Sequence, residues 1–195
     1  MEPLTVEEIE TARRKVLINA IELFEEGTLL FCNGHFPRAY ALAQFCCEEL
    51  AKLPMLTRAA ATLILGKEMD WKTLDRRLRS HTDKINLLHY QEALTHPMSL
   101  EYADEDTSEE LRATTSTLNK RKNESLYSGI SGTVFCMPSE LITEEIASEH
   151  LDSTQDRLER FQFFESLCAG RMEELFADPE ARSQLEEFFE EAEEE

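Results

Sequence analysis

The 195-residue chain is long enough for one domain with its own core, since 42% of its residues are hydrophobic. Glycine and proline are scarce, with six of each, and 31% of the residues are charged, which favours helices and argues against a β-sandwich or barrel. The net charge is −20, but residues 138–195 contribute most of it, with 19 acidic and 4 basic residues. The total charge therefore does not exclude nucleic-acid binding, although no continuous basic stripe is visible.

The first predicted helix spans about residues 6–32 and has signals at both ends. Thr5 and Glu8 have the spacing of a capping box, and Gly34 follows the last apolar residues. Pro37 suits the first turn of a second helix, and Pro54 should kink or end it. Periodicity and punctuation predict these further helices: 37–53, 55–67, 71–94 with Asp70 as its cap, 108–125 and 139–169.

Two segments do not fit this helical pattern. Residues 98–108 read as an acidic loop, and residues 127–140 hold two glycines, a proline and a β-like run. We therefore expect an all-α protein, an antiparallel bundle of five or six helices with one irregular loop near 127–139. We expect residues 1–170 to form this single domain and residues 171–195 to form an acidic C-terminal helix or tail.

The five cysteines give no disulfide framework and no paired zinc motif, because their number is odd and their spacing irregular. Buried free thiols in a reducing cytosol are the expectation. The N-terminus is acidic and already patterned, so we expect no signal peptide, and no apolar run approaches the roughly 20 residues of a membrane span. These observations predict a cytoplasmic protein with no membrane partner.

Charged groups interrupt the apolar second helix. At about 100° per residue, Glu49 falls at the edge of the apolar stripe, whereas Glu48 projects to the far side. Arg38 lies on the same line as Glu49, and Lys52 is one turn from both glutamates. We therefore expect Glu49 to be the partly buried carboxylate, which needs a cationic partner, and Glu48 to be solvated.

The third helix offers one such partner. His81 lies within its apolar face, flanked one turn away by Arg77 and Lys84. A single histidine on an apolar face is more often a core residue than a catalyst, but flanking cations would create a positive concavity beside the imidazole. Both interpretations remain open at this stage.

A third polar group comes from the helix near residue 120. Lys122 shares a face with apolar residues, and Tyr127 follows where that helix ends. A lysine that extends its amine to the surface and a packed aromatic ring are the simpler explanations. Contact with Glu49 is the alternative.

Several kinds of site are excluded by spacing. Cys32 and His35 form half of a zinc motif without a second half, and no histidine has a glutamate three residues before it, as di-iron bundles require. Phosphate-binding, dinucleotide-binding and hydrolase glycine motifs are absent from the sequence. We therefore expect no metal and no cofactor.

The order of these motifs resembles that of a known family. The second helix reads A-x-A-L-A-x-F-x-x-E-E-L-x-K from Ala39 to Lys52, His81 and Lys84 form H-x-x-K, and Lys122 precedes the Leu-Tyr pair that ends at Tyr127. This arrangement resembles the AbiV-type abortive-infection family of the HEPN superfamily over roughly residues 10–135. The Glu-Glu-x-x-Lys helix is the most specific part of the resemblance.

The resemblance implies a small helical bundle that pairs into a homodimer and acts in bacterial defence against phage. Proteins of this type are associated with arrest of growth or translation once a phage protein is sensed. Many HEPN proteins are metal-independent ribonucleases that carry an arginine followed a few residues later by a histidine, as Arg76 and His81 are here. On an uninterrupted helix this spacing separates the two side chains by about 140°, whereas Arg77 shares the face of His81.

Two functions follow as hypotheses from different classes. In the first, RNA is the substrate, His81 is the acid or base, Arg77, Lys84 and Lys122 hold the phosphate, and Glu49 orients one of these groups. Lys52 and Tyr127 would also contact substrate. In the second, the polar cluster is structural and the chain is a protein-binding module that senses a phage or translation component. A small-molecule pocket between helices is a third alternative.

Overall fold

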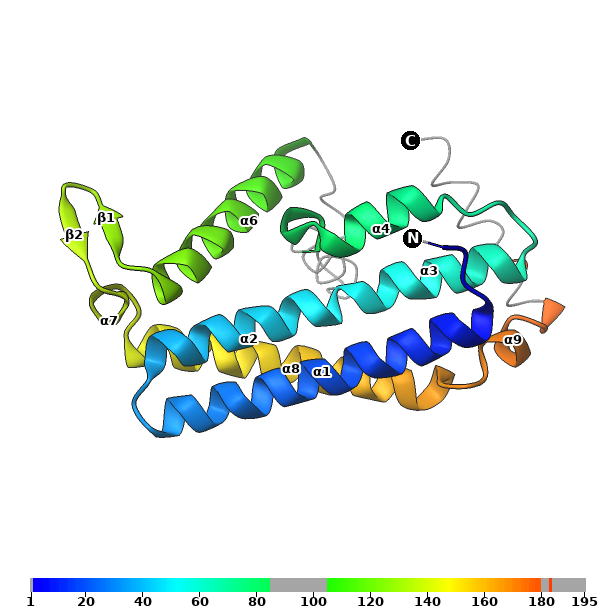
Figure 1. Cartoon of the computed structure of the whole chain (residues 1–195), viewed down its shortest axis with the longest axis horizontal. Coiled ribbons are helices and arrows are strands. Elements are labelled where there is room, and N and C mark those ends of the chain that lie inside the picture. Colours follow the sequence, from blue (N-terminus) through cyan, green and yellow to red (C-terminus); the bar gives the residue numbers. More distant parts are fainter. Residues whose placement is uncertain (1, 85–104, 180–182, 184–195) are drawn as a thin grey trace.

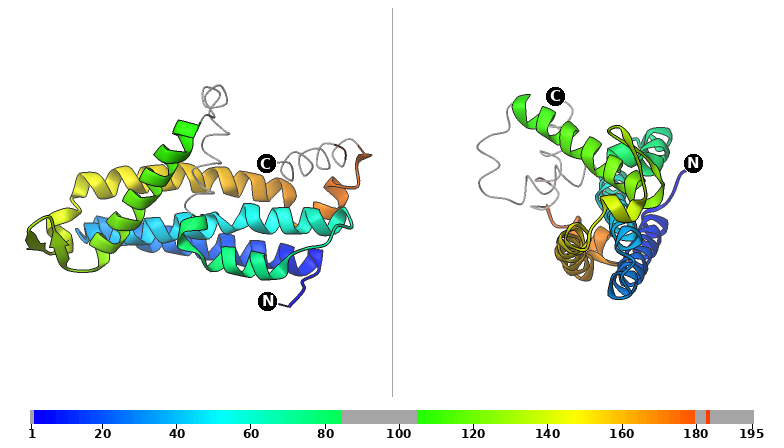
Figure 2. Two further views of the ribbon diagram at one scale, coloured as in Figure 1. Left: turned by 90° about the horizontal axis from the view of Figure 1, so that it is seen from above. Right: turned by 90° about the vertical axis from the view of Figure 1, so that its left-hand side faces the viewer.

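The computed structural model describes residues 2–84, 105–179 and 183. Figure 1 shows three long helical rods side by side: α1 (Val6–Cys32), the nearly collinear pair α2 (Phe36–Leu50) and α3 (Lys52–Ile64), and α8 (Glu144–Cys168). The chain direction alternates between α1 and the α2–α3 rod, and α8 runs antiparallel to α1. The end-on view in Figure 2 shows these rods bundled together, with α4 and α6 on the opposite side of α2 and α3. The expectation of an all-α bundle is confirmed.

Helix α1 has the bounds that its capping signals predict. The Thr5 hydroxyl accepts a hydrogen bond from the Glu8 amide at 3.2 Å, and the Glu8 carboxylate accepts one from the Thr5 amide at 2.8 Å. The helix ends at Cys32, and Gly34 takes the left-handed conformation with φ 77° that lets the chain turn back. Local sequence is sufficient to define this element.

We expect Thr5→Ala to lower the free energy of unfolding by about 1 kcal/mol, because the Glu8 amide in the first turn loses the hydroxyl that caps it. Urea denaturation of both proteins measures this change. Thr28→Ala is a matched control, since its hydroxyl bonds a carbonyl inside the helix and caps nothing. Equal effects of the two substitutions would contradict the assignment of the cap.

The second predicted helix ends earlier than expected. Its boundary falls at Ala51 rather than at Leu53, and Pro54 lies in the first turn of α3. The physical reason is that a proline ring clashes with the carbonyl four residues before it, which here belongs to Leu50. The break therefore lies one turn upstream of the proline.

The third predicted helix is interrupted. Asp70 caps α4 (Trp71–Arg79) as predicted, with its carboxylate accepting from the Thr73 amide at 3.0 Å. The helix ends at Ser80, which has an extended ψ of 119°, and a new helical turn covers 81–84. The Ser80 hydroxyl caps this turn by accepting from the Asp83 amide at 3.2 Å. The prediction of one continuous helix through Ser80 is wrong, and residues 85–94 lie outside the described residues.

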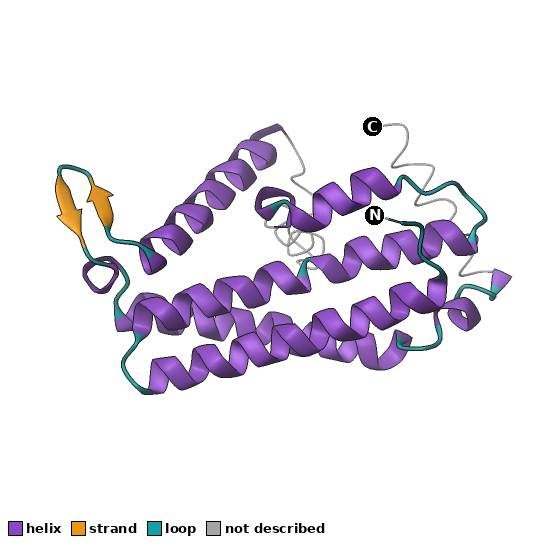
Figure 3. Ribbon diagram, viewed as in Figure 1, coloured by secondary structure: helices purple, strands orange, loops and turns teal. Residues whose placement is uncertain are grey.

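The irregular segment contains a small β-hairpin. Helix α6 (Glu105–Leu126) leads into β1 (Gly129–Ser131), which pairs antiparallel with β2 (Val134–Cys136), and Figure 3 shows the hairpin projecting from one end of the molecule. The short helix α7 (Pro138–Leu141) follows, and Thr143 then caps α8, so the helix predicted over 139–169 is divided. Of the predicted acidic loop, 98–104 lies outside the described residues and 105–108 belongs to α6.

Close packing holds the three rods together. A Cβ added at Gly27 of α1 would lie 3.4 Å from the Ala39 carbonyl oxygen of α2, so the two helices approach closely there. Arg13 of α1 forms a buried ion pair with Glu165 of α8. After α8, Met172 of α9 (Met172–Leu175) is 1% exposed and packs in the core.

None of the helices in the described part of the chain combines the length and apolarity needed to cross a membrane.

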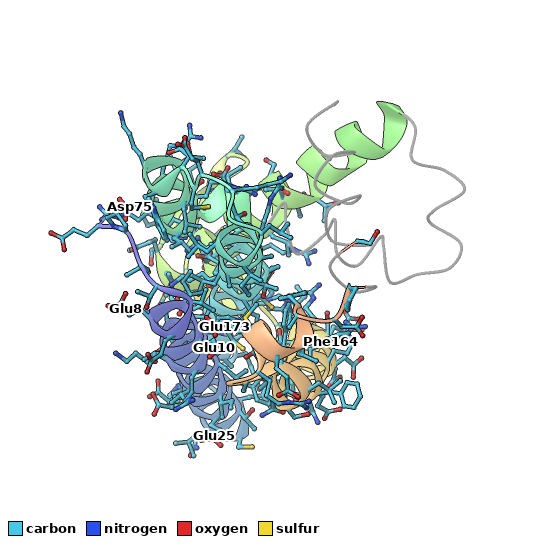
Figure 4. All side chains as sticks on the ribbon, turned by 90° about the vertical axis from the view of Figure 1, so that its right-hand side faces the viewer. Glu8, Glu10, Glu25, Asp75, Phe164 and Glu173 are labelled. Carbon is cyan, nitrogen blue, oxygen red and sulfur yellow. The ribbon has the colours of Figure 1, made fainter. Side chains whose placement is uncertain are left out.

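Acidic side chains cover the outside of this bundle. Figure 4 looks along the bundle from the end where α1 begins and α8 finishes, and it shows Glu8 and Glu25 projecting outward from α1. This arrangement is what a net charge of −20 on a helical protein requires, because the carboxylates stay hydrated. Buried charges such as that of Glu48 are therefore exceptions that need an explanation.

Candidate functional site

The candidate site is built around the carboxylate of Glu48 on α2. This side chain is buried, and it binds groups from two segments that are distant in the sequence. One oxygen, Oε1, accepts from Lys122 Nζ of α6 at 2.8 Å. The other, Oε2, is hydrogen-bonded to Nδ1 of His81 and lies 3.3 Å from Lys84 Nζ. The structure thus brings His81, Lys84 and Lys122 together, as the sequence predicts, but on a different glutamate.

The assignment of Glu49 as the inner carboxylate is wrong. Glu49 instead forms an ion pair with Lys52, and its side chain is 17% exposed against 3% for Glu48. The error arises because helix α2 is buried on two sides. Helices α1 and α8 cover its apolar stripe, while α6 and the turn at 81–84 cover the far side, where Glu48 projects. The side of a helix opposite its apolar stripe is exposed only when no other element packs against that side.

Opposing effects act on the ionisation of Glu48. Burial alone would raise the pKa of its carboxyl group, but the hydrogen bonds from Lys122 and His81 outweigh burial and lower the pKa. Lys84 and Lys122 are each only 6% exposed, and the Lys122 ammonium also lies 5.9 Å from the centre of the Phe45 ring. The carboxylate is therefore ionised at neutral pH, and two buried ammonium groups depend on its charge.

His81 joins this buried cluster to the surface. Its side chain is 57% exposed although Nδ1 contacts the buried carboxylate. The break at Ser80 makes this placement possible, since His81 begins a new helical turn instead of continuing α4. A carboxylate on Nδ1 fixes the orientation of the ring. Nε2 is then the nitrogen that a ligand can approach.

The remaining predicted site residues lie outside the cluster. Arg77 is half-buried in the last turn of α4, and within the described residues no hydrogen bond or ion pair joins it to Glu48 or His81. Lys52 pairs with Glu49, and the Tyr127 side chain is exposed beyond the end of α6. The proposed roles of Arg77, Lys52 and Tyr127 in substrate binding stay predictions.

Arg38 supports the cluster, a role that the sequence does not reveal. Its guanidinium donates to the carbonyl oxygens of Ser125 at 3.0 Å and Leu126 at 2.9 Å, at the C-terminal end of α6. Ser125 in turn donates to the Lys122 carbonyl at 2.6 Å. A cation at a helix C-terminus satisfies carbonyls that have no partner in the helix. Arg38 therefore holds the end of α6, which carries Lys122, against α2.

A second polar group between α2 and α8 is buried and has different properties. His150 stacks on the ring of Tyr40, with centroids 4.3 Å apart. Burial, with smaller effects from Arg157 and Arg121, lowers the pKa of His150 to about 3. Burial also raises the pKa of the Cys46 thiol, so it is a poor nucleophile. His150 is neutral at physiological pH, which leaves His81 as the better candidate for proton transfer.

Comparison with known proteins identifies the family of the chain. The family model for AbiV, a HEPN family, matches residues 8–159, which is well over half of the chain. No curated protein and no solved structure matches the chain. The matched range includes Glu48, His81 and Lys122, the residues that meet in the cluster. The chain therefore belongs to the AbiV family, and this membership indicates a role in abortive infection, the defence of bacteria against phage.

Proposed function

We propose that this protein arrests growth of the infected cell by cleaving RNA without a metal ion, with His81 as the group that transfers protons. One observation carries the proposal: a buried, ionised Glu48 holds Nδ1 of an imidazole that is 57% exposed. A carboxylate–histidine pair of this kind orients the ring and stabilises its charged form during proton transfer. Such pairs are typical of catalytic sites.

The chemistry requires an internal attack within RNA. Nε2 of His81 removes the proton from a ribose 2′-OH, and the 2′ oxygen forms a bond to the adjacent phosphorus. The bond from phosphorus to the 5′ oxygen then breaks, and the imidazolium of His81, or of a second copy in a homodimer, returns a proton to that oxygen. The products are a 2′,3′-cyclic phosphate and a free 5′-OH. No redox step and no metal is needed.

The buried lysines serve this reaction indirectly. Both ammonium groups are directed at Glu48, so they keep the carboxylate ionised rather than contacting phosphate. Glu48, Lys84 and Lys122 together carry a net positive charge, which attracts a phosphate to the adjacent imidazole. Arg77, four residues before His81 at the end of α4, is the candidate for direct contact with the phosphorane.

Analysis of the RNA ends produced in infected cells tests this proposal. We expect RNA from phage-infected bacteria that express the chain to accumulate 2′,3′-cyclic phosphate ends, which an RNA ligase specific for these ends can capture. Infected cells without the chain provide the background, and purified protein assayed in EDTA tests whether metal is needed. Growth arrest without any increase in such ends would contradict cleavage and favour the alternative, a non-enzymatic protein that binds a phage or translation component.

A further inference from the structure

Helix α4 and the turn after it concentrate positive charge in an otherwise acidic protein. Residues 71–84 hold five lysines and arginines against two aspartates, a net charge of +3 in a chain that carries −20. Lys72, Arg76 and Arg79 have the i, i+4, i+7 spacing of one helical face, and all three are exposed. We call these three residues the basic stripe.

The residues around the basic stripe do not neutralise it. Arg79 pairs with Asp75 at 3.0 Å, but the Arg79 side chain is still 78% exposed. Arg76 forms no hydrogen bond or ion pair among the described residues. The stripe ends two residues before His81, so a polyanion that binds it lies close to the imidazole. The stripe is therefore a surface on which phosphates or carboxylates can bind.

The C-terminal end of the same chain has the opposite charge. Residues 184–195, which lie outside the described residues, contain seven glutamates and no basic residue. Phe188 and Phe189 stand in the middle of this run. Two adjacent phenylalanines do not improve the solubility of a tail, whereas aromatic rings pack well on arginine side chains. The composition fits a segment that binds a basic surface.

The fold places the last described helix on the same core as α4. Helices α4 and α9 both pack on α3, and Leu74 of α4 and Met172 of α9 belong to one hydrophobic cluster. Figure 1 shows that α4 begins at the end of the molecule where α9 lies. At the rise of a helix, residues 180–195 span roughly 24 Å, whereas α4 is about 14 Å long. The acidic segment is therefore long enough to reach along the whole stripe.

We propose that residues 184–195 dock on the basic stripe of the same molecule and thereby keep RNA away from His81. Charge complementarity and the position of α9 carry the proposal. Exposed ion pairs are individually weak and sensitive to salt, but the short tether raises the local concentration of the glutamates at the stripe. The docking stands independently of the proposed function, whereas the exclusion of RNA rests on it.

Acetylation of Lys72 in the full-length protein tests the docking, because carboxylates that cover its amine slow the reaction. We call E187Q/E190Q/E191Q the tail variant. Mass spectrometry should show Lys72 reacting about 3-fold faster in the tail variant than in the wild type, as expected if about two thirds of the wild-type molecules are docked. The wild type should reach the faster rate in about 0.5 M salt, which screens surface ion pairs.

The matched control variant is E22Q/E25Q/E26Q, which removes three exposed glutamates with the same spacing from α1. It should leave the acetylation rate of Lys72 as it is in the wild type. Lys120 of α6, whose side chain is 70% exposed, is the internal reference and should react equally in all three proteins. Circular dichroism verifies that both variants keep their helical content.

Two acetylation results would overturn the docking, whether or not the protein cleaves RNA. The first is an equal rate for Lys72 in the wild type and the tail variant. The second is protection of Lys72 that grows with protein concentration, which would assign the contact to the acidic segment of another molecule.

Binding of a fluorescent single-stranded RNA in EDTA tests the exclusion of RNA. We expect the tail variant to bind RNA about 3-fold more tightly than the control variant, because both lose three charges but only the tail variant frees the stripe. Equal RNA affinity of the two variants would overturn the exclusion. A protein that protects Lys72 as expected but binds no RNA in any form supports the docking and contradicts the proposed function.

Discussion

Glutamine in place of Glu48 is expected to lower the free energy of unfolding by about 3–5 kcal/mol, the usual cost of removing one partner from a buried ion pair. The substitution keeps the size of the side chain and removes its charge. Lys84 and Lys122 would then remain buried, each 6% exposed, without a carboxylate to compensate their charge. Urea denaturation measures the change, and thermal denaturation should show a fall of about 10 °C for a chain of this length.

The neighbouring glutamate supplies a matched control for this experiment. Glu49→Gln removes the same charge one residue away, but Glu49 and Lys52 are partly exposed, so the expected loss is below about 1 kcal/mol. Equal losses in the two variants would contradict the assignment of Glu48 as the inner carboxylate. The comparison therefore tests directly which of the two adjacent glutamates is the buried one.

The wild-type protein and Glu48→Gln should also differ in how their stability responds to acid. Because the pKa of Glu48 is lower in the folded state than in the unfolded state, its contribution is present above the ordinary glutamate pKa and is lost as the pH falls through the folded value. Wild-type stability should therefore fall more steeply below about pH 4.5 than that of Glu48→Gln. Parallel stability curves for the two proteins would contradict this origin of the pKa shift.

Capping residues predicted the start of a helix correctly where a few neighbouring residues determine that start. The Thr5 capping box and the Asp70 cap define where their helices begin, and each involves residues three apart. The break at Ser80 was also encoded locally, because Ser80 and Asp83 have the spacing of a helix cap, but the apolar periodicity on either side concealed it. The spacing of apolar residues indicates which face of a helix is buried, but it does not indicate whether the helix is continuous.

The identity of the buried carboxylate could not be derived from one helical face. Whether Glu48 is covered depends on where α6 packs, and this contact joins residues 74 positions apart. One signal does point to it. No charged residue occurs between Arg38 and Glu48, which indicates a helix that is buried all round rather than along a stripe. Glu48 is the first charged residue after this run, so its burial is consistent with that indication.

Replacing His81 with alanine is expected to abolish growth arrest and to reduce the 2′,3′-cyclic phosphate ends by about 10²–10⁴-fold, the range for loss of a general acid or base. Stability should change little. The His81 side chain is 57% exposed, and Glu48 keeps its contacts with Lys84 and Lys122 when the imidazole is removed. The measurements are RNA-end capture, growth after infection and thermal denaturation of the same variant.

His35→Ala is the matched control, because His35 is also an exposed histidine but lies at the start of α2, where its side chain makes no capping hydrogen bond. It should leave both arrest and stability unchanged. A purely structural cluster predicts the opposite pattern for His81→Ala, with a lower melting temperature and arrest that weakens only as folded protein is lost. Unchanged arrest in stably folded His81→Ala would exclude His81 as the catalytic group. Loss of arrest without loss of stability requires His81 to act on something outside the fold, and an imidazole that is 57% exposed and held by the buried Glu48 is placed to do so.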